Sequence, residues 1–88
     1  MCEVGENPVS SVGTAEYDQL LVVLREARKR ANVTQRGLSL SLGRSVTYID
    51  KVERGVRRVD VIEFCLIARA LGIGPMDLFK DLLARTEL

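Results

Sequence analysis

Four helix-ending residues divide this chain into short segments and constrain its fold more than any other feature. Asn and Gly tolerate the left-handed backbone with which helices commonly end, and they stand at Asn32, Gly43, Gly55 and Gly72. Between them, apolar residues recur at the i, i+3 and i+4 spacing of one helix face. No alternating pattern typical of a strand is present in the sequence. We therefore expect an all-α fold, a compact domain of five helices.

Residues that favour a helix start precede each segment. They are Thr14, Thr34 and Ser45 as N-caps, Asp60 with Glu63 as a capping box, and Pro75 in a first turn. The predicted helices cover about residues 15–31, 35–42, 46–54, 61–71 and 75 onward. The second and third are short and one tight turn apart, which is the arrangement of a helix-turn-helix motif.

The length of 88 residues allows one domain, whose core is thin enough for dimerisation to add useful buried surface. Residues 1–13 combine Gly, Pro, Asn and Ser without helical periodicity, so we predict a flexible tail there. Residues 14–88 are the predicted folded domain. The sequence has neither a basic leader followed by an apolar run nor a membrane-spanning stretch, which predicts a cytoplasmic protein with no membrane partner.

The residue patterns of a zinc site, a disulfide framework or a catalytic site are not present in the sequence. Histidine is absent, and the two cysteines, Cys2 and Cys65, lack partners at metal-ligand spacing. We therefore expect no zinc site, no disulfide framework and no cofactor. No Ser or Cys is paired with a base and no glycine-rich loop is suited to phosphate, so we do not expect an enzyme.

Charge is distributed unevenly along the chain, although the net charge is only +1. Residues 19–58 carry ten Lys or Arg against three acids, whereas residues 1–18 carry four acids and no base. Residues 59–88 carry three bases and five acids. The basic middle block is what a surface facing phosphate requires, and a set of solvated helix faces is the alternative.

Four short motifs occur in order between residues 24 and 79. They are Leu24-Arg25-Glu26 with Arg28, Thr34-Gln35, Ile49 through Val52-Glu53-Arg54-Gly55, and Ala68 to Leu71-Gly72. In this order and spacing they resemble the lambda-repressor-like, Xre/Cro-type helix-turn-helix family. The resemblance implies a double-stranded DNA-binding transcriptional regulator, a repressor or an activator, which binds a palindromic operator as a homodimer.

The resemblance implies that a helix from Ser45 to Arg54 lies in the DNA major groove and reads bases with its outward side. By family position the base-contacting residues are Val46, Thr47 and Lys51. Lys can donate to guanine, Thr can hydrogen-bond or touch a thymine methyl, and Val can make only the apolar contact. A solvated lysine or a phosphate contact is the alternative for Lys51.

A second group of residues is expected to contact DNA phosphates. Gln35 opens the second helix, where backbone N–H groups also favour an anion, and simple capping support is its alternative role. The predicted phosphate-contacting residues are Gln35, Arg36, Arg44, Ser45, Tyr48, Arg54, Arg57 and Arg58. The family pattern assigns Arg28 and Glu53 instead to a structural ion pair or helix-end bond.

Four positions depart from the family pattern. Ser39 replaces the usual alanine and adds a hydroxyl able to bond back to its own helix. Gly37, expected to be exposed in the second helix, costs about 1 kcal/mol against alanine. Val46 replaces a more common polar residue, and Asp50 adds an acid that either accepts from a cytosine amino group or repels phosphate.

The fourth helix is more apolar than one buried face requires. If its core face includes Val61, Phe64, Ala68 and Leu71, two other large residues project to the opposite side. The predicted interface of a two-fold homodimer comprises Ile62, Leu66, Leu82 and Leu83. The alternative is that the N-terminal tail or the last helix covers Ile62 and Leu66.

A rival function uses the same apolar surface. An antitoxin-like interaction protein would bind a second polypeptide there, and a neighbouring toxin gene or a co-purifying polypeptide would favour it. Contact with RNA polymerase or a partner protein is compatible with either function. Sites selected from random duplex DNA would favour the regulator.

Overall fold

The computed structural model describes residues 14–88. Within that range the chain forms five helices and no strand: α1 (Ala15–Arg30), α2 (Gln35–Ser41), α3 (Tyr48–Glu53), α4 (Val61–Ala70) and α5 (Pro75–Arg85). The all-α, five-helix expectation is confirmed. The predicted flexible tail, residues 1–13, lies outside the described residues.

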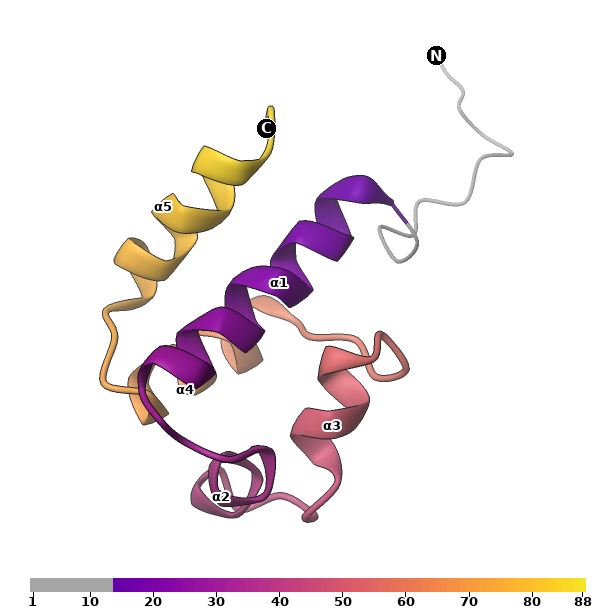
Figure 1. Cartoon of the computed structure of the whole chain (residues 1–88), viewed down its shortest axis with the longest axis vertical. Helices are drawn as coiled ribbons and strands as arrows, with labels where there is room; N and C mark the ends of the chain where they lie inside the picture. Colours follow the sequence, from indigo (N-terminus) through magenta and orange to yellow (C-terminus); the bar gives the residue numbers. More distant parts are fainter. Residues whose placement is uncertain (1–13) are drawn as a thin grey trace.

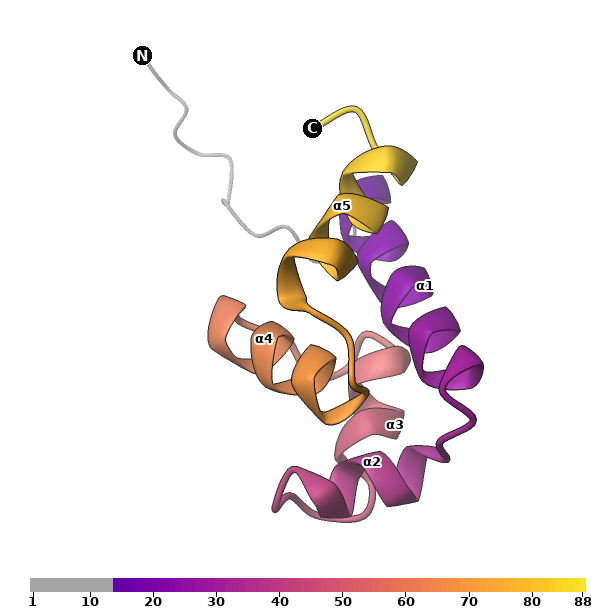
Figure 2. The ribbon, with the colours of Figure 1, turned by 90° about the vertical axis from the view of Figure 1, so that its left-hand side faces the viewer.

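The helices are arranged with the helix-turn-helix pair at one end of the molecule. Figures 1 and 2 show α1 and α5 side by side at one end and α2 with α3 at the other. Helix α1 packs against both α5 and α3, and α4 packs against α5 and α2. Ion pairs from Arg30 to Asp81 (3.5 Å) and from Arg85 to Glu26 join α1 to α5. The pair α2–α3 is therefore held on a scaffold made by the other three helices.

The local start and stop signals act as predicted at four of the five helices. Thr14 Oγ1 accepts from the Tyr17 backbone N–H (3.1 Å), and Thr34 Oγ1 accepts from that of Gly37 (2.9 Å). Asp60 caps α4 in a complete capping box, and α5 has its proline in the first turn. The predicted helix-ending residues all have positive φ: Asn32 at 60°, Gly43 at 72°, Gly55 at 79° and Gly72 at 76°.

The third helix begins later than predicted. Ser45, the expected N-cap, lies instead in a turn in which its carbonyl accepts from the Tyr48 N–H (3.1 Å). Thr47 occupies the N-cap position, but its side chain makes no capping hydrogen bond. The start is fixed from α2, because the buried Ser39 hydroxyl accepts from the Ile49 backbone N–H (3.0 Å).

Ser39 thus has two roles. Its Oγ also donates to the Gln35 carbonyl at 2.8 Å, so the predicted bond back to its own helix is confirmed. The side chain is fully buried, and one hydroxyl serves as donor within α2 and as acceptor for α3. Helix α3 is therefore attached to α2 by a polar link as well as by apolar packing.

The core fills the space between the helices with small and branched residues. Its members buried to 2% exposure or less are Val23, Ala27, Leu38, Ile49, Val52, Ile67, Ala68 and Leu78. The predicted core face of α4 is wrong at its start: Val61 is 75% exposed, and Ile67 takes the inward place. Leu82 is also buried (8% exposed), which removes it from the predicted dimer surface.

Candidate nucleic-acid interface

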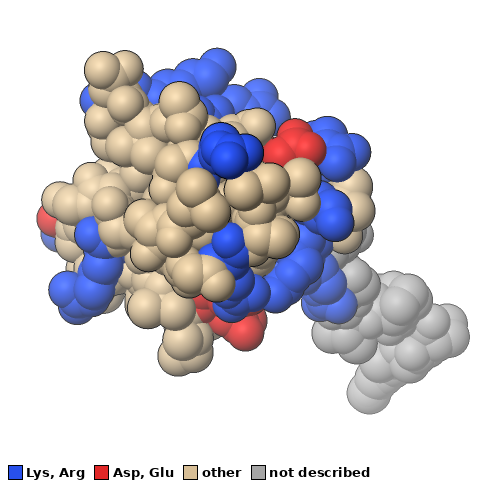
Figure 3. Space-filling model, turned by 90° about the horizontal axis from the view of Figure 1, so that it is seen from below, with Lys and Arg blue, Asp and Glu red and all other residues tan. Residues whose placement is uncertain are grey.

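The charged side chains on the surface at the α2–α3 end are mostly basic. Figure 3 views this end and shows Lys and Arg side chains spread over it, with few Asp or Glu among them. The predicted phosphate-contacting residues differ in exposure. Arg36, Ser45, Arg54 and Arg58 are exposed, Gln35, Arg44 and Arg57 are half-buried, and Tyr48 is buried.

The three predicted base-contacting residues lie together on the outside of this end. Val46 and Thr47 form the turn before α3, and Lys51 follows one helical turn later. All three are exposed, and the Lys51 backbone N–H donates to the Thr47 carbonyl at 3.0 Å. The Lys51 carbonyl in turn accepts from the N–H groups of Val56 (2.9 Å) and Arg57 (3.1 Å). The loop after α3 is thereby fixed to the same helix that presents the Lys51 side chain.

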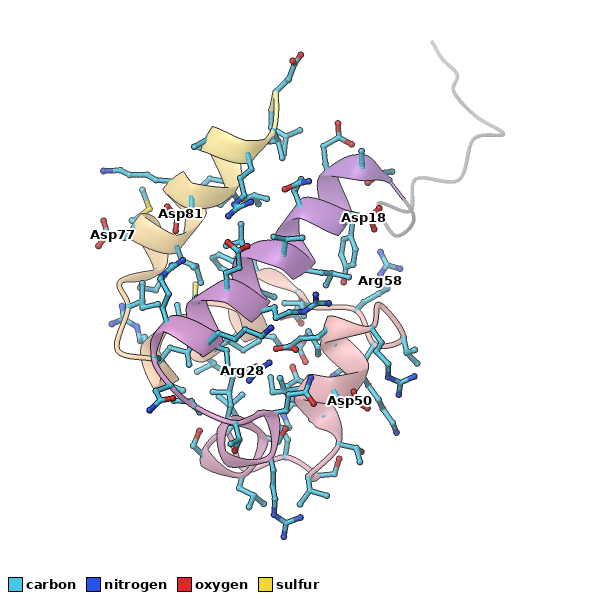
Figure 4. All side chains as sticks on the ribbon, in the orientation of Figure 1. Asp18, Arg28, Asp50, Arg58, Asp77 and Asp81 are labelled. Carbon is cyan, nitrogen blue, oxygen red and sulfur yellow. The ribbon has the colours of Figure 1, made fainter. Side chains whose placement is uncertain are left out.

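A buried carboxylate connects α3 to α1 and α2. Glu53 is 5% exposed and receives the Arg28 guanidinium through Nε (2.6 Å) and Nη2 (3.1 Å). Arg28 also donates to the Val33 carbonyl at 2.9 Å, which ties down the α1–α2 connection. Figure 4 shows Arg28 in the space between α1 and α3. The predicted structural pair of Arg28 and Glu53 is confirmed.

Gln35 belongs to the same network. Its side-chain Nε2 donates to Glu53 Oε1 at 2.8 Å, so the amide is oriented from within the protein. Arg25 lies at a longer 3.8 Å from the same carboxylate oxygen. Gln35 thus has a structural role that was not predicted, since α2 is capped by Thr34 and not by Gln35. Its contact with phosphate stays a prediction.

A second cluster surrounds Tyr48. The guanidinium carbons of Arg44 and Arg57 lie 4.6 and 5.3 Å from the centre of its ring. Both arginines pair with Glu63, Arg44 at 3.2 Å and Arg57 at 2.7 Å. Tyr48 is only 6% exposed under these groups. The structure thus corrects the placement of Tyr48, which was expected on the phosphate-facing surface.

Glu63 was not among the predicted site residues. The sequence indicated its capping-box role alone, because the two arginines that it pairs with lie 19 and 6 residues earlier in the chain. Burial raises the pKa of Glu63, but hydrogen bonds from the Asp60 backbone and the Arg57 side chain outweigh that effect and hold the pKa below its ordinary 4.5. Burial and the nearby Glu63 carboxylate raise the pKa of Tyr48.

Asp50 and Arg54 form a further pair on α3. Their side chains meet at 3.1 Å with i, i+4 spacing and remain 40% and 58% exposed. Figure 4 places Asp50 on the side of α3 that faces away from Arg28. The Arg54 charge offsets the acid that departs from the family pattern, and a phosphate would have to compete with Asp50 for Arg54.

Residues 14–88 contain no group of three or more His, Cys, Asp or Glu arranged to hold a metal ion. None of the helices in that range is long and apolar enough to cross a membrane.

Comparisons with known proteins agree with this geometry. A family model described as helix-turn-helix matches residues 24–78. An XRE-family like protein from Pseudomonas syringae pv. tomato str. DC3000 is 43% identical, with a TM-score of 0.76, over 82% of this chain and 88% of that one. This chain belongs to the Xre-type helix-turn-helix family. The motif of this helix-turn-helix protein is formed by α2 and α3, as expected.

A second solved structure similar to this helix-turn-helix protein is the clp gene regulator ClgR from Corynebacterium glutamicum. It is 26% identical, with a TM-score of 0.70, over 80% of this chain and 74% of that one. A search of curated protein sequences found no significant match. Family membership makes the chain a DNA-binding transcription regulator.

Proposed function

We propose that this protein regulates transcription by binding a palindromic operator in double-stranded DNA as a homodimer, within the cytoplasm. The observation that carries the proposal is the exposure of Val46 and Thr47 just before α3 and of Lys51 within it, at the end of the molecule where the charged side chains are mostly basic. Side chains at the start of such a helix reach base edges when the helix enters the major groove. Backbone contacts are then assigned to Gln35, Arg36, Arg44, Ser45, Arg54, Arg57 and Arg58.

The arrangement explains why specificity and affinity would come from different residues. The arginines around Val46, Thr47 and Lys51 would bind the DNA phosphates and so provide affinity. The exposed side chains at the start of α3 would contact the base edges and so provide specificity. Glu53 and Glu63 keep the basic side chains nearest the core in fixed places. The surface is therefore organised before DNA arrives, which lowers the entropy cost of binding.

Selection of sites from random duplex DNA tests the proposal directly. We expect an enriched inverted repeat whose affinity falls steeply with salt, because cationic contacts release counterions. Arg58→Ala should lower the slope of log affinity against log salt by about 1 and weaken specific and random DNA alike. Failure to enrich any sequence, together with salt-independent binding, would contradict the proposal.

The homodimer part of the proposal depends on an apolar surface of α4 and α5. The exposed large apolar residues of these helices are Val61 (75%), Ile62 (66%), Leu66 (49%), Met76 (69%), Phe79 (42%) and Leu83 (38%), which we together call the α4–α5 face. Val61, Met76 and Phe79 line one groove, whereas Leu66 lines a separate small pocket with Arg44 and Tyr48. Met76, Phe79 and Leu83 recur at i, i+3 and i+7, so they form one stripe along α5. Ile62, Leu66 and Leu83 were predicted to lie in the dimer interface, whereas Val61 was predicted to lie in the core.

The same face contains a groove between α4 and α5 of about 380 Å³. Phe64 and Phe79 meet edge to face beside it, with ring centres 6.5 Å apart. An apolar groove flanked by protruding Val61 and Met76 fits a second copy that offers the same protrusions, as a two-fold interface requires. If a different polypeptide occupied this face, the antitoxin-like alternative would be favoured instead.

A further inference from the structure

Glu63 is an acidic residue placed beneath two of the arginines assigned to DNA. Its side chain is 9% exposed, while those of Arg44 and Arg57 are 38% and 42% exposed. The carboxylate therefore lies on the inner side of the pair, and the guanidinium groups keep an outer side in contact with solvent.

The arginines come from the two connections that flank α3. Arg44 precedes the helix and Arg57 follows it, and both guanidinium groups lie over the Tyr48 ring in its first turn. Arg57 is held further by a hydrogen bond of 2.6 Å to the Arg58 carbonyl. Without a common anchor, two long side chains on separate loops would lose considerable rotamer entropy on meeting one ligand.

Glu63 is itself firmly placed. Its Oε1 accepts from the Asp60 backbone N–H at 3.0 Å, so the capping box that starts α4 also orients the carboxylate. Glu63 Oε2 then receives Arg44 and Arg57 at 3.2 and 2.7 Å. Two guanidinium groups and one carboxylate leave a net charge of +1, which matches one phosphodiester.

Arg44 and Arg57 have enough N–H donors to bind one phosphate together. Each guanidinium has five N–H donors in a planar fork. The contacts with Glu63 and with the Arg58 carbonyl use only Nη2 of Arg44 and the Nη1 and Nη2 groups of Arg57. The remaining N–H donors can donate to phosphate oxygens without breaking the pairs to Glu63. Charge-assisted hydrogen bonds of this kind are stronger than neutral ones.

We propose that Glu63 is a positioning residue that holds Arg44 and Arg57 as one phosphate clamp over Tyr48, so that a single DNA phosphate is bound by both arginines. This inference rests on the proposed function, because it assigns a DNA phosphate as the ligand. Glu63 does not touch the DNA, and its effect passes through the two guanidinium groups.

If Glu63 positions the arginines, its removal should change DNA affinity in the direction opposite to the one that simple electrostatics predicts. Removing any acid from a DNA-binding protein should strengthen DNA binding, because the phosphate backbone is then repelled less. Removing the acid that positions the arginines should weaken it. Glu63→Gln is a suitable change, since the amide oxygen can still accept from the Asp60 N–H and keep the α4 cap.

The experiment compares wild type, Glu63→Gln and the matched control Glu87→Gln on one duplex over a series of salt concentrations. Glu87 is exposed near the C-terminus and undergoes the same charge change. We expect Glu63→Gln to bind roughly tenfold more weakly, with a salt slope smaller by about 1 to 2. Glu87→Gln should bind equally or slightly more tightly, with the slope unchanged.

Two further measurements separate positioning from folding. Circular dichroism tests whether each variant is folded at the assay temperature. If Glu63→Gln is unfolded, Glu63→Asp replaces it, because that change keeps the charge and shortens the side chain. In an Arg57→Ala background, Glu63→Gln should have a clearly smaller effect on the salt slope than in wild type.

The outcomes distinguish the two levels of the hypothesis. A wild-type protein that binds no duplex would overturn the proposed function itself. A wild type that binds while folded Glu63 variants bind as tightly or more tightly, with the same slope, would overturn the clamp alone. Full additivity of Glu63→Gln and Arg57→Ala would also overturn it.

Discussion

Lys51 provides the sharpest test at the scale of one residue. It is exposed on α3 one turn after Thr47, where an ammonium group can reach guanine acceptors in the major groove. Lys51→Ala should cost about 1 to 3 kcal/mol on the preferred site and relax discrimination at one base pair of each half-site. Binding to a panel of single-base operator variants measures both effects.

Lys80→Ala is the control for that experiment, because Lys80 is exposed on α5 and carries the same charge. It should leave base preference unchanged. If Lys51→Ala weakened every sequence equally, Lys51 would be a phosphate contact, and the base assignment would be wrong.

Individual side-chain partners were predictable only where a motif encodes them. The pairing of Arg28 with Glu53 followed from the family pattern, and the structure confirms it at 2.6 Å. The pairing of Arg44 and Arg57 with Glu63 did not, because it depends on how two loops approach the start of α4. Charge counts locate a basic segment, but they do not tell which arginines an internal carboxylate holds.

At the scale of elements, the polar link between α2 and α3 depends on the Ser39 hydroxyl. Ser39→Ala restores the usual family residue but leaves the Ile49 N–H without its acceptor in a buried site. We expect a loss of about 1 to 3 kcal/mol in the free energy of unfolding. Urea denaturation measures it, with Ser41→Ala as the control.

Ser41 is exposed on the same helix and donates only to the Leu38 carbonyl within α2, at 2.8 Å. Its removal should therefore change the free energy of unfolding little. Equal stabilities for Ser39→Ala and Ser41→Ala would show that the hydroxyl contributes nothing to the start of α3.

Glu63 makes the stability of the α4 start depend on pH. Its pKa in the folded protein is below the ordinary 4.5, so its contribution is present above about pH 4.5 and is lost as the pH falls through the lowered pKa. The stability difference between wild type and Glu63→Gln should therefore shrink from about pH 6 to about pH 3. Chemical denaturation at the two pH values tests this, and a constant difference would contradict it.

Helix starts were predicted wherever the cap is local. Thr14, Thr34 and Asp60 each accept from an N–H three residues later in the sequence, so the pattern is visible in the chain. The start of α3 was placed too early at Ser45 because its acceptor is Ser39, which lies ten residues before Ile49. A cap supplied by another helix is a tertiary contact and leaves no local signature.

At the scale of the whole molecule, the order and number of helices followed from local signals, but the assignment of surfaces did not. Val61 was expected inside and is 75% exposed, whereas Leu82 was expected outside and is 8% exposed. Both errors concern tertiary packing, since α5 packs against both α1 and α4 and these contacts decide which flank of each helix is covered. Periodicity shows that a helix has an apolar face, but the orientation of the neighbouring helices decides which residues at the edges of that face are buried.

The predicted homodimer is best tested at Ile62 and not at Leu66. Leu66 lines a small pocket with Arg44, Tyr48 and Glu63, so an acid there would also disturb the clamp. Ile62 is more exposed and does not line that pocket. Ile62→Glu should favour monomers, because its carboxylate would be desolvated in both copies of a two-fold interface.

Ala84→Glu is the matched control, since it adds the same charge to α5 outside the stripe of Met76, Phe79 and Leu83. Sedimentation at matched concentrations should give a dimer for wild type and Ala84→Glu and a monomer for Ile62→Glu. The monomer should bind a single half-site weakly, because the second half-site no longer acts at high effective concentration. Wild-type footprints should show two half-sites about 34 Å apart on one side of the duplex, one turn of B-DNA. A monomeric wild type, or a dimeric Ile62→Glu that binds normally, would move the interface away from the α4–α5 face.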